Sequence, residues 1–269
     1  MSTATTTPDQ TRATEPVEID VDRPGIPLSR LVTVELRKLF NTRAAFWLST
    51  VILLLNAVIV VIAAFAVDDV AVATNFELLL LPAGFLLPVL AILLATSEWS
   101  QRSALTTFTI EPRRSRVVVA KLLTSAAAAV VAVAAATVFA YLGTALADAL
   151  GNAGPEPWHV TAALFANGVL TVLLSLLMGF GFGMVLMNSP AAIVLFFALP
   201  TVWSLVGALV PWVRDNLQEW LDFNDAAMVL SGTAWASGDE WSRIATSGAV
   251  WILLPLVVGV WRLLRAEVK

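Results

Sequence analysis

Long apolar runs are the feature that most constrains this chain. A helix needs about 20 predominantly apolar residues to cross the core of a bilayer. Six stretches meet that need, at about 44–67, 78–97, 118–146, 160–187, 191–212 and 244–264. Of the 269 residues, 58% are hydrophobic and only 13% are charged, which is too little charge to cover a water-soluble domain. The pattern predicts an all-α integral membrane protein with six transmembrane helices.

Basic residues are distributed unevenly about these spans. All 16 Lys and Arg except Arg214 and Arg243 lie before the first span, around the loop between the second and third, or at the end of the sixth. The opposite loops are acidic, and include Asp68, Asp69 and Glu156. Because basic loops are retained in the cytoplasm, we expect a multi-pass protein of the plasma membrane with both termini cytoplasmic.

Two segments precede the first span. Residues 1–27 are rich in Thr, Pro and acids, so we expect a disordered cytoplasmic tail, followed by a transmembrane domain over 28–269. The segment Leu28–Asn41 places apolar residues on one helical face, and Arg37 and Lys38 on the other. This pattern predicts an amphipathic helix that lies flat in the inner membrane interface. A basic flank that only fixes orientation is the alternative.

The loop between the second and third spans is the most informative segment. It reads EWSQRSALTTFTIEPRRSRVVVAKLL, with a Thr-rich helical repeat before Pro112 and a basic cluster after it. Pro112 should end any helix at or before Glu111. We therefore expect a short amphipathic helix that projects into the cytoplasm, followed by a turn back into the membrane. A loop whose arginines only fix orientation remains the alternative.

Polar residues are few within the predicted spans. Asn56 lies in the middle of the first span, and Asn167, Thr171 and Ser175 follow a four-residue spacing on one face of the fourth. Because polar groups are costly in hydrocarbon, these side chains should face other helices. Two roles remain open for this polar stripe, namely hydrogen bonding between helices and the lining of a substrate path.

The sequence offers little chemistry of its own. It has no cysteine and one histidine, His159, which excludes thiolate nucleophiles and multi-histidine metal sites. The phosphate-binding pattern Gly-x-x-x-x-Gly-Lys-Ser/Thr does not occur. The glycines Gly179, Gly181 and Gly183 lie inside the fourth span, where we expect them to permit close helix packing. We predict that the chain is not an enzyme and has no catalytic, metal or ATP site.

The order of these elements resembles the permease subunits of type-2 ABC transporters, which are mostly exporters. The resemblance covers Leu28 to the C-terminus. The segment VELRKLFNTRAAFWL is similar to the amphipathic helix that precedes the first span in that family. Its matching residues are Glu35, Arg37, Lys38 and Arg43. The loop between the second and third spans is similar to the family's loop of an acid, a basic residue, a Thr-rich helix, a Pro-containing turn and a Lys. Ser103-Ala104 stands where family members often have Gly-Thr.

The resemblance implies that Arg102–Ile110 is a coupling helix that docks on a separate ATPase. The residues implied in coupling are Glu98, Arg102, Thr106, Pro112, Arg113, Arg114, Arg116 and Lys121. It further implies pairing with a second permease, as a homodimer or with a paralogue, and ATP and Mg²⁺ held by the ATPase partner.

We therefore expect an ATP-driven exporter of an amphipathic, lipid-like or antibiotic-like substrate, a class that includes multidrug exporters. Its partners would be the ATPase, the second permease and the lipid bilayer, with no nucleic acid. A non-transporting membrane scaffold or immunity protein is the alternative.

Overall fold

The computed structural model describes residues 26–265, and over this range every regular element is a helix. The predicted disordered tail, residues 1–27, lies outside the described residues except for its last two. Six helices are long and apolar enough to cross a membrane, so the fold is that of an all-α integral membrane protein. These spans are α2 (Arg43–Ala66), α3 (Val72–Ala95), α6 (Arg114–Leu150), α7 (Ala162–Leu186), α8 (Ser189–Leu209) and the continuous helix Gly238–Arg265.

Several helices are longer than the apolar runs that predict them. The second span begins at Val72 rather than at 78, and the third extends over 114–150 rather than 118–146. The sixth span begins at Gly238 rather than at 244, because Ser237 and Glu240 form a capping box ahead of the apolar residues. Polar residues at a helix end are stabilised by such caps and by water, so the helix continues beyond its apolar part.

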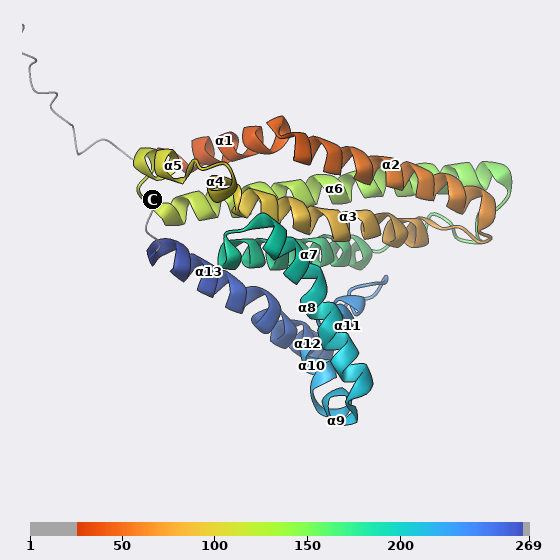
Figure 1. Cartoon of the computed structure of the whole chain (residues 1–269). Helices are drawn as coiled ribbons and strands as arrows, with labels where there is room; N and C mark the ends of the chain where they lie inside the picture. The colour runs from red at the N-terminus through yellow and green to blue at the C-terminus, as the bar shows by residue number, and fades with distance from the viewer. Residues whose placement is uncertain (1–25, 266–269) are drawn as a thin grey trace, which may run out of the picture.

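Four of the spans pack side by side as the body of the molecule. Figure 1 shows α2, α3, α6 and α7 running alongside one another, and each of these helices contacts at least two of the others. Of the most apolar part of each span, 56% of α3 is buried but only 22% of α8. Thus α3 is a central helix, whereas α8 lies at the periphery.

Glycines let α7 approach its neighbours closely, as the sequence predicts. A Cβ atom on Gly179 would lie 2.7 Å from the backbone oxygen of Pro88 in α3, and one on Gly181 would lie 3.1 Å from Pro255 Cβ. Pro255 belongs to α13 (Leu254–Arg265), which completes the sixth span after α12 (Gly238–Gly248) and the π-helical segment Ala249–Leu253. The glycine cluster therefore packs α7 against two different helices.

The helices α8 and α13 leave the four-helix body at an angle (Figure 1). Four short helices follow α8, namely α9 (Pro211–Val213), the π-helical Arg214–Gln218, α10 (Glu219–Leu221) and α11 (Phe223–Met228). They are tied to the spans, because Ser204 Oγ donates to Asp222 Oδ2 at 2.6 Å and Trp251 Nε1 donates to the Leu221 carbonyl at 2.6 Å. In the sequence of this stretch, Leu217, Trp220 and Leu221 share one helical face, which allows either a short helix or a loop, and the structure has helices.

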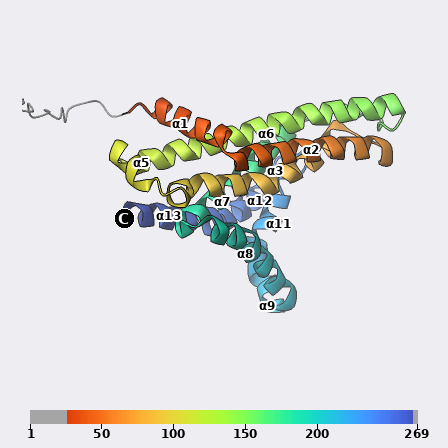
Figure 2. The same ribbon diagram turned by 45° about the horizontal axis from the view of Figure 1, so that its top comes forward.

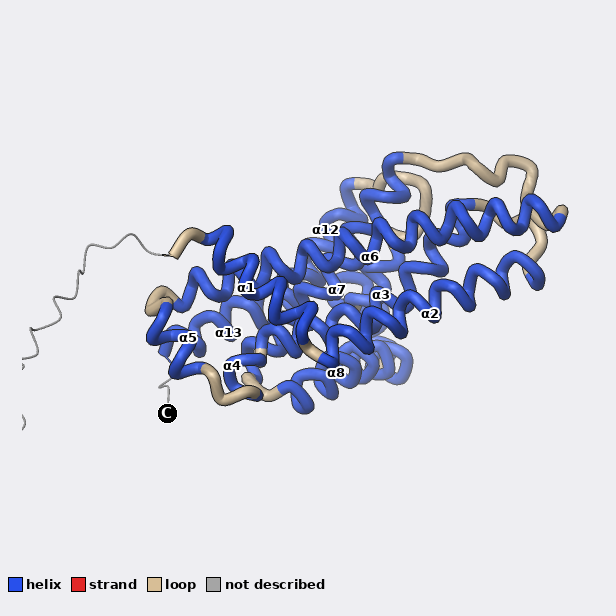
Figure 3. Tube along the Cα trace, turned by 90° about the horizontal axis from the view of Figure 1, so that it is seen from above, coloured by secondary structure: helices blue, strands red, loops and turns tan. Residues whose placement is uncertain are grey.

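Charge separates the two ends of the four-helix body. One end carries α1 (Leu28–Asn41), α4 (Ser97–Ser100), α5 (Ala104–Ile110) and the last turn of α13 (Figures 1 and 3). We call it the basic end, because most of the Lys and Arg residues lie there. At the other end, Val70 pairs with Ala153 between loops that contain Asp68, Asp69 and Glu156. We call this the acidic end.

Candidate functional site

Four charged side chains from three helices meet at the basic end. Lys121 Nζ of α6 lies 2.9 Å from Glu98 Oε2 of α4 and 3.2 Å from Glu35 Oε2 of α1. Lys38 Nζ of α1 lies 2.6 Å from Glu35 Oε1 and 3.5 Å from Glu98 Oε1. We call these residues the ionic cluster. Its two carboxylates and two ammonium groups balance, so the cluster is formally neutral.

Lys121 also closes the end of α3. Its ammonium donates to the Leu94 carbonyl at 2.7 Å and to Ser97 Oγ at 2.8 Å. Leu94 belongs to the last turn of α3, where helix carbonyls lack an intrahelical partner and a cation is favoured. The ionic cluster therefore joins α1, α3, α4 and α6 at one point.

Burial makes this pairing obligatory. The side chains of Lys121, Glu98 and Glu35 are 3%, 2% and 5% exposed, whereas that of Lys38 is 38% exposed. Partial burial alone lowers the pKa of Lys38, but Glu35 and Glu98 outweigh this effect, and the pKa lies above its ordinary value. A buried charge without its partner is strongly destabilising, so the cluster constrains the position of α1 and α4 against the bundle.

One face of α5 is anchored to the bundle. The Arg114 guanidinium lies 4.9 Å from the centroid of the Phe108 ring, and Arg114 Nη1 donates to the Leu263 carbonyl of α13 at 2.6 Å. The chain just beyond α5 is also held, because Arg116 Nη1 lies 3.3 Å from Glu111 Oε2. Arg116 donates in addition to the Ile26 carbonyl, next to α1.

The opposite face of α5 is exposed and partly apolar. Leu105 is 62% exposed and Ile110 is 65% exposed. Exposed basic side chains flank the helix, with Arg102 before it and Arg113 after it. Figure 2 shows α5 at the basic end, beside the start of α6. The helix thus presents a partly apolar surface between two cations, outside the six spans.

The structure brings together residues that the sequence assigns to two separate segments, the N-terminal amphipathic helix and the loop between the second and third spans. Glu98 and Lys121 of the loop between the spans lie in the ionic cluster with Glu35 and Lys38 of the N-terminal helix. The exposed Arg37, and Arg43 at the start of α2, lie outside it. The predicted helix Arg102–Ile110 begins two residues later, at Ala104.

The other implied coupling residues lie outside the ionic cluster. Arg102 belongs to the turn before α5, with a φ of 55°. Thr106 is exposed on α5, and Pro112 is exposed just after it. The basic group of Arg113, Arg114 and Arg116 is divided, because the first is exposed, the second bonds to α13, and the third bonds to Glu111 and to the Ile26 carbonyl.

The polar stripe is divided between different surroundings. Thr171 and Ser175 line a cavity of about 530 Å³ between α3, α7, α8 and α11. Asn167, one turn earlier, instead donates to the carbonyls of Gly232 at 3.4 Å and Ala234 at 2.8 Å. Asn56 is fully buried in α2, where its side-chain amide has no hydrogen-bond partner in the described part of the chain.

Comparison with known proteins gives no family for this chain. No protein-family model matches it, and no curated protein matches it. Within residues 26–265, no group of three or more His, Asp or Glu side chains could hold a metal ion.

Proposed function

We propose that this chain is the transmembrane subunit of an ATP-driven exporter of the type-2 ABC class, which moves an amphipathic, lipid-like or antibiotic-like substrate. One observation carries the proposal. The loop between α3 and α6 exposes an apolar helix face at the basic end, and its base is fixed by the buried ionic cluster. An element that is exposed at one end and rigidly held at the other suits the transmission of force from a partner.

The exposed face of α5 suits a protein partner. A short helix with Leu105 and Ile110 outward and Phe108 inward can place its apolar side chains in a groove of a second protein. Arg102 and Arg113 flank this face and would favour an acidic rim around that groove. The proposed partner is an ATPase that binds ATP and Mg²⁺.

A displacement of α5 would reach several helices. The ionic cluster joins α4 to α1 and α6. Between α3 and α4, Thr96 Oγ1 lies 2.6 Å from Ser189 Oγ, the first residue of α8. Because packed interiors deform little, a force on α4 and α5 would move these helices together.

The charge distribution supports an orientation for this proposal. With the basic end in the cytoplasm, α5 and both termini would face a cytoplasmic ATPase, in agreement with the retention of basic loops on that side. The membrane would then be the plasma membrane. A second permease, either the same chain or a paralogue, would complete the pathway.

The proposal is tested by purifying the tagged chain from its native membranes in a mild detergent. We expect a stoichiometric ATPase with a Walker motif, identified by mass spectrometry, and Mg²⁺-dependent ATP hydrolysis in the same fraction. The double variant Leu105→Asp, Ile110→Asp should lose the ATPase yet elute as a folded protein. Trp235→Asp is the matched control, because Trp235 is 63% exposed but lies in the loop before α12.

Recovery of the intact chain without an ATPase would overturn the proposal. It would instead favour the alternative of a membrane scaffold or immunity protein.

A further inference from the structure

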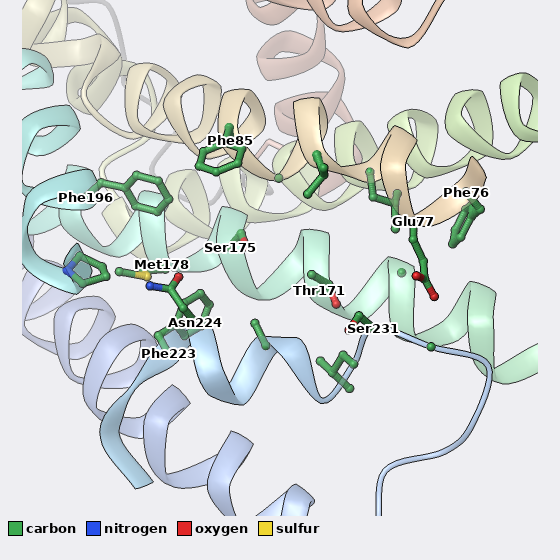
Figure 4. A pocket seen from close by; sticks show the side chains of 18 of the residues that line it. Phe76, Glu77, Phe85, Thr171, Ser175, Met178, Phe196, Phe223, Asn224 and Ser231 are labelled. Atoms are coloured by element: carbon green, nitrogen blue, oxygen red, sulfur yellow. The ribbon is translucent and has the colours of Figure 1, made fainter. Parts of the chain in front are cut away.

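The cavity beside α7 has the dimensions of a ligand site. Its volume of about 530 Å³ lies within the range of about 300–1,000 Å³ that is typical of small-molecule pockets. Residues of α3, α7, α8 and α11 line it (Figure 4). Most of the lining is apolar, with a few polar side chains among it, which is the usual composition of such a site.

The two ends of the cavity differ in charge. Figure 4 shows Glu77, Thr171 and Ser231 toward one end, together with Phe76, and Phe85, Phe196 and Phe223 toward the other, together with Asn224. Along α3, the eight residues from Glu77 to Phe85 correspond to about 12 Å of helix. Phe85 also stacks on the ring of Phe197, with 6.4 Å between the ring centroids. One end of the site therefore carries the charge of Glu77, and the other end, which we call the aromatic end, is uncharged and has more aromatic rings.

Among the residues that the structure describes, Glu77 is the only ionisable one that lines the cavity. Its carboxylate makes no hydrogen bond or ion pair with any residue between 26 and 265. Glu77 lies near the start of α3, at the acidic end, and its carboxylate is only partly buried, so a cation beside it would gain a favourable charge interaction. Charge complementarity thus selects a positively charged ligand over a neutral or negative one.

The aromatic end opens on the surface of the spans. Phe85 is 58% exposed and Leu81 is 54% exposed, although both line the cavity. Both belong to α3, one of the six spans, so this opening would face the acyl chains of a bilayer. A ligand dissolved in the membrane could enter from the side, with its apolar part leading.

We propose that this cavity binds an amphipathic organic cation. The cationic head pairs with Glu77 near Thr171 and Ser231, and the apolar body lies against Phe85 and Phe196. That such a cation is the exported substrate rests on the proposed function. The binding of the cation in the cavity requires neither ATP nor a partner protein.

The test uses the purified full chain in nanodiscs of uncharged phosphatidylcholine, without ATPase or nucleotide. The probe is trimethylammonium-diphenylhexatriene, which joins a rigid apolar body to a quaternary ammonium head. Energy transfer from tryptophan reports its binding. Uncharged diphenylhexatriene is the matched probe with the same body, and saturable binding of the cationic probe to the wild-type chain is expected.

Two variants distinguish the contribution of the Glu77 charge from that of the space in the cavity. Glu77→Gln should weaken binding of the cationic probe at least tenfold and leave the neutral probe unchanged, whereas Glu156→Gln, at the acidic end but outside the cavity, should change neither. A Cβ atom on Gly84 would meet nothing within 4 Å, so Gly84→Leu should occupy part of the cavity and weaken binding of both probes.

The outcomes distinguish this inference from the proposed function. Unchanged affinity of the cationic probe in Glu77→Gln or in Gly84→Leu would overturn the binding site, even if an ATPase co-purifies with the chain. Conversely, the expected pattern of binding in a chain that recovers no ATPase would support the site and reject the transporter.

Discussion

The ammonium of Lys121 lies 2.9 Å from the carboxylate of Glu98, and both side chains are almost completely buried. Glu35 approaches the same ammonium from α1 at 3.2 Å. Each of these groups would be unfavourable alone, because removal of a charge from water costs several kcal/mol. The basic end therefore depends on the three groups together, and its stability should respond unequally to their removal.

Loss of Lys121 should be far more damaging than loss of Lys38. Lys121→Met leaves the two buried carboxylates with only the part-exposed Lys38 as a cationic partner, and we expect a loss of about 3–5 kcal/mol in the free energy of unfolding. Lys38→Met should lower the free energy of unfolding clearly less, because the Lys38 side chain is 38% exposed and Glu35 remains paired with Lys121. Thermal unfolding in one detergent, followed by tryptophan fluorescence, compares the two. Equal midpoints would contradict the assigned role of burial.

Two neighbouring arginines should differ in their effect on α5. Arg114→Ala removes the contact with Phe108 and the hydrogen bond to Leu263, which together should contribute more than about 1.4 kcal/mol, a factor of about ten in local opening. Hydrogen exchange of a peptide over 104–110 should therefore be at least tenfold faster. Arg113→Ala is the matched control, because its side chain is exposed. Equal exchange in both variants would show that α5 is not anchored at Arg114.

Much of the fold can be predicted from the pattern of apolar residues. The six spans follow from runs of sufficient length, and the bounds of α1 follow from the regular spacing at Leu28–Asn41. The burial of Glu35 can also be predicted from the sequence. This residue lies four residues from both Leu31 and Leu39, so it belongs to the apolar face of α1, where a carboxylate needs a buried partner.

The partners of that carboxylate cannot be predicted in the same way. Periodicity shows which face of a helix is buried, but not which helix covers it. Asn167 and Thr171 share a face of α7, yet one bonds the loop near Gly232 and the other lines the cavity. For the stretch between α8 and α12 the sequence leaves both a helix and a loop open, because contacts with distant residues, such as that of Trp251 with Leu221, help to fix the short helices.

Asn167 should stabilise the loop that precedes α12. Asn167→Ala removes its hydrogen bonds to the Gly232 and Ala234 carbonyls, and we expect a cost of about 1–3 kcal/mol. Limited proteolysis should then cut faster within 229–237. Thr171→Val is the control on the same helix face, because Thr171 makes no hydrogen bond to the loop. Faster cleavage in both variants would point to a general loosening of α7 instead.

Because α3 and α7 are in close contact at Gly179, a larger residue at this position should destabilise the protein. Gly179→Ala would place its Cβ 2.7 Å from the backbone oxygen of Pro88, so the two helices must separate, at a cost of about 1–3 kcal/mol. Gly248→Ala is the matched control, because its Cβ would meet nothing within 4 Å and alanine favours a helix by up to about 1 kcal/mol.

The midpoint of thermal unfolding should therefore fall for Gly179→Ala and hold or rise for Gly248→Ala. A fall in both would mean that alanine is unfavourable for a reason other than the approach of α3. Because α3 carries Glu77 and α7 carries Thr171, separation of these helices should also widen the cavity and weaken binding of the cationic probe in Gly179→Ala alone.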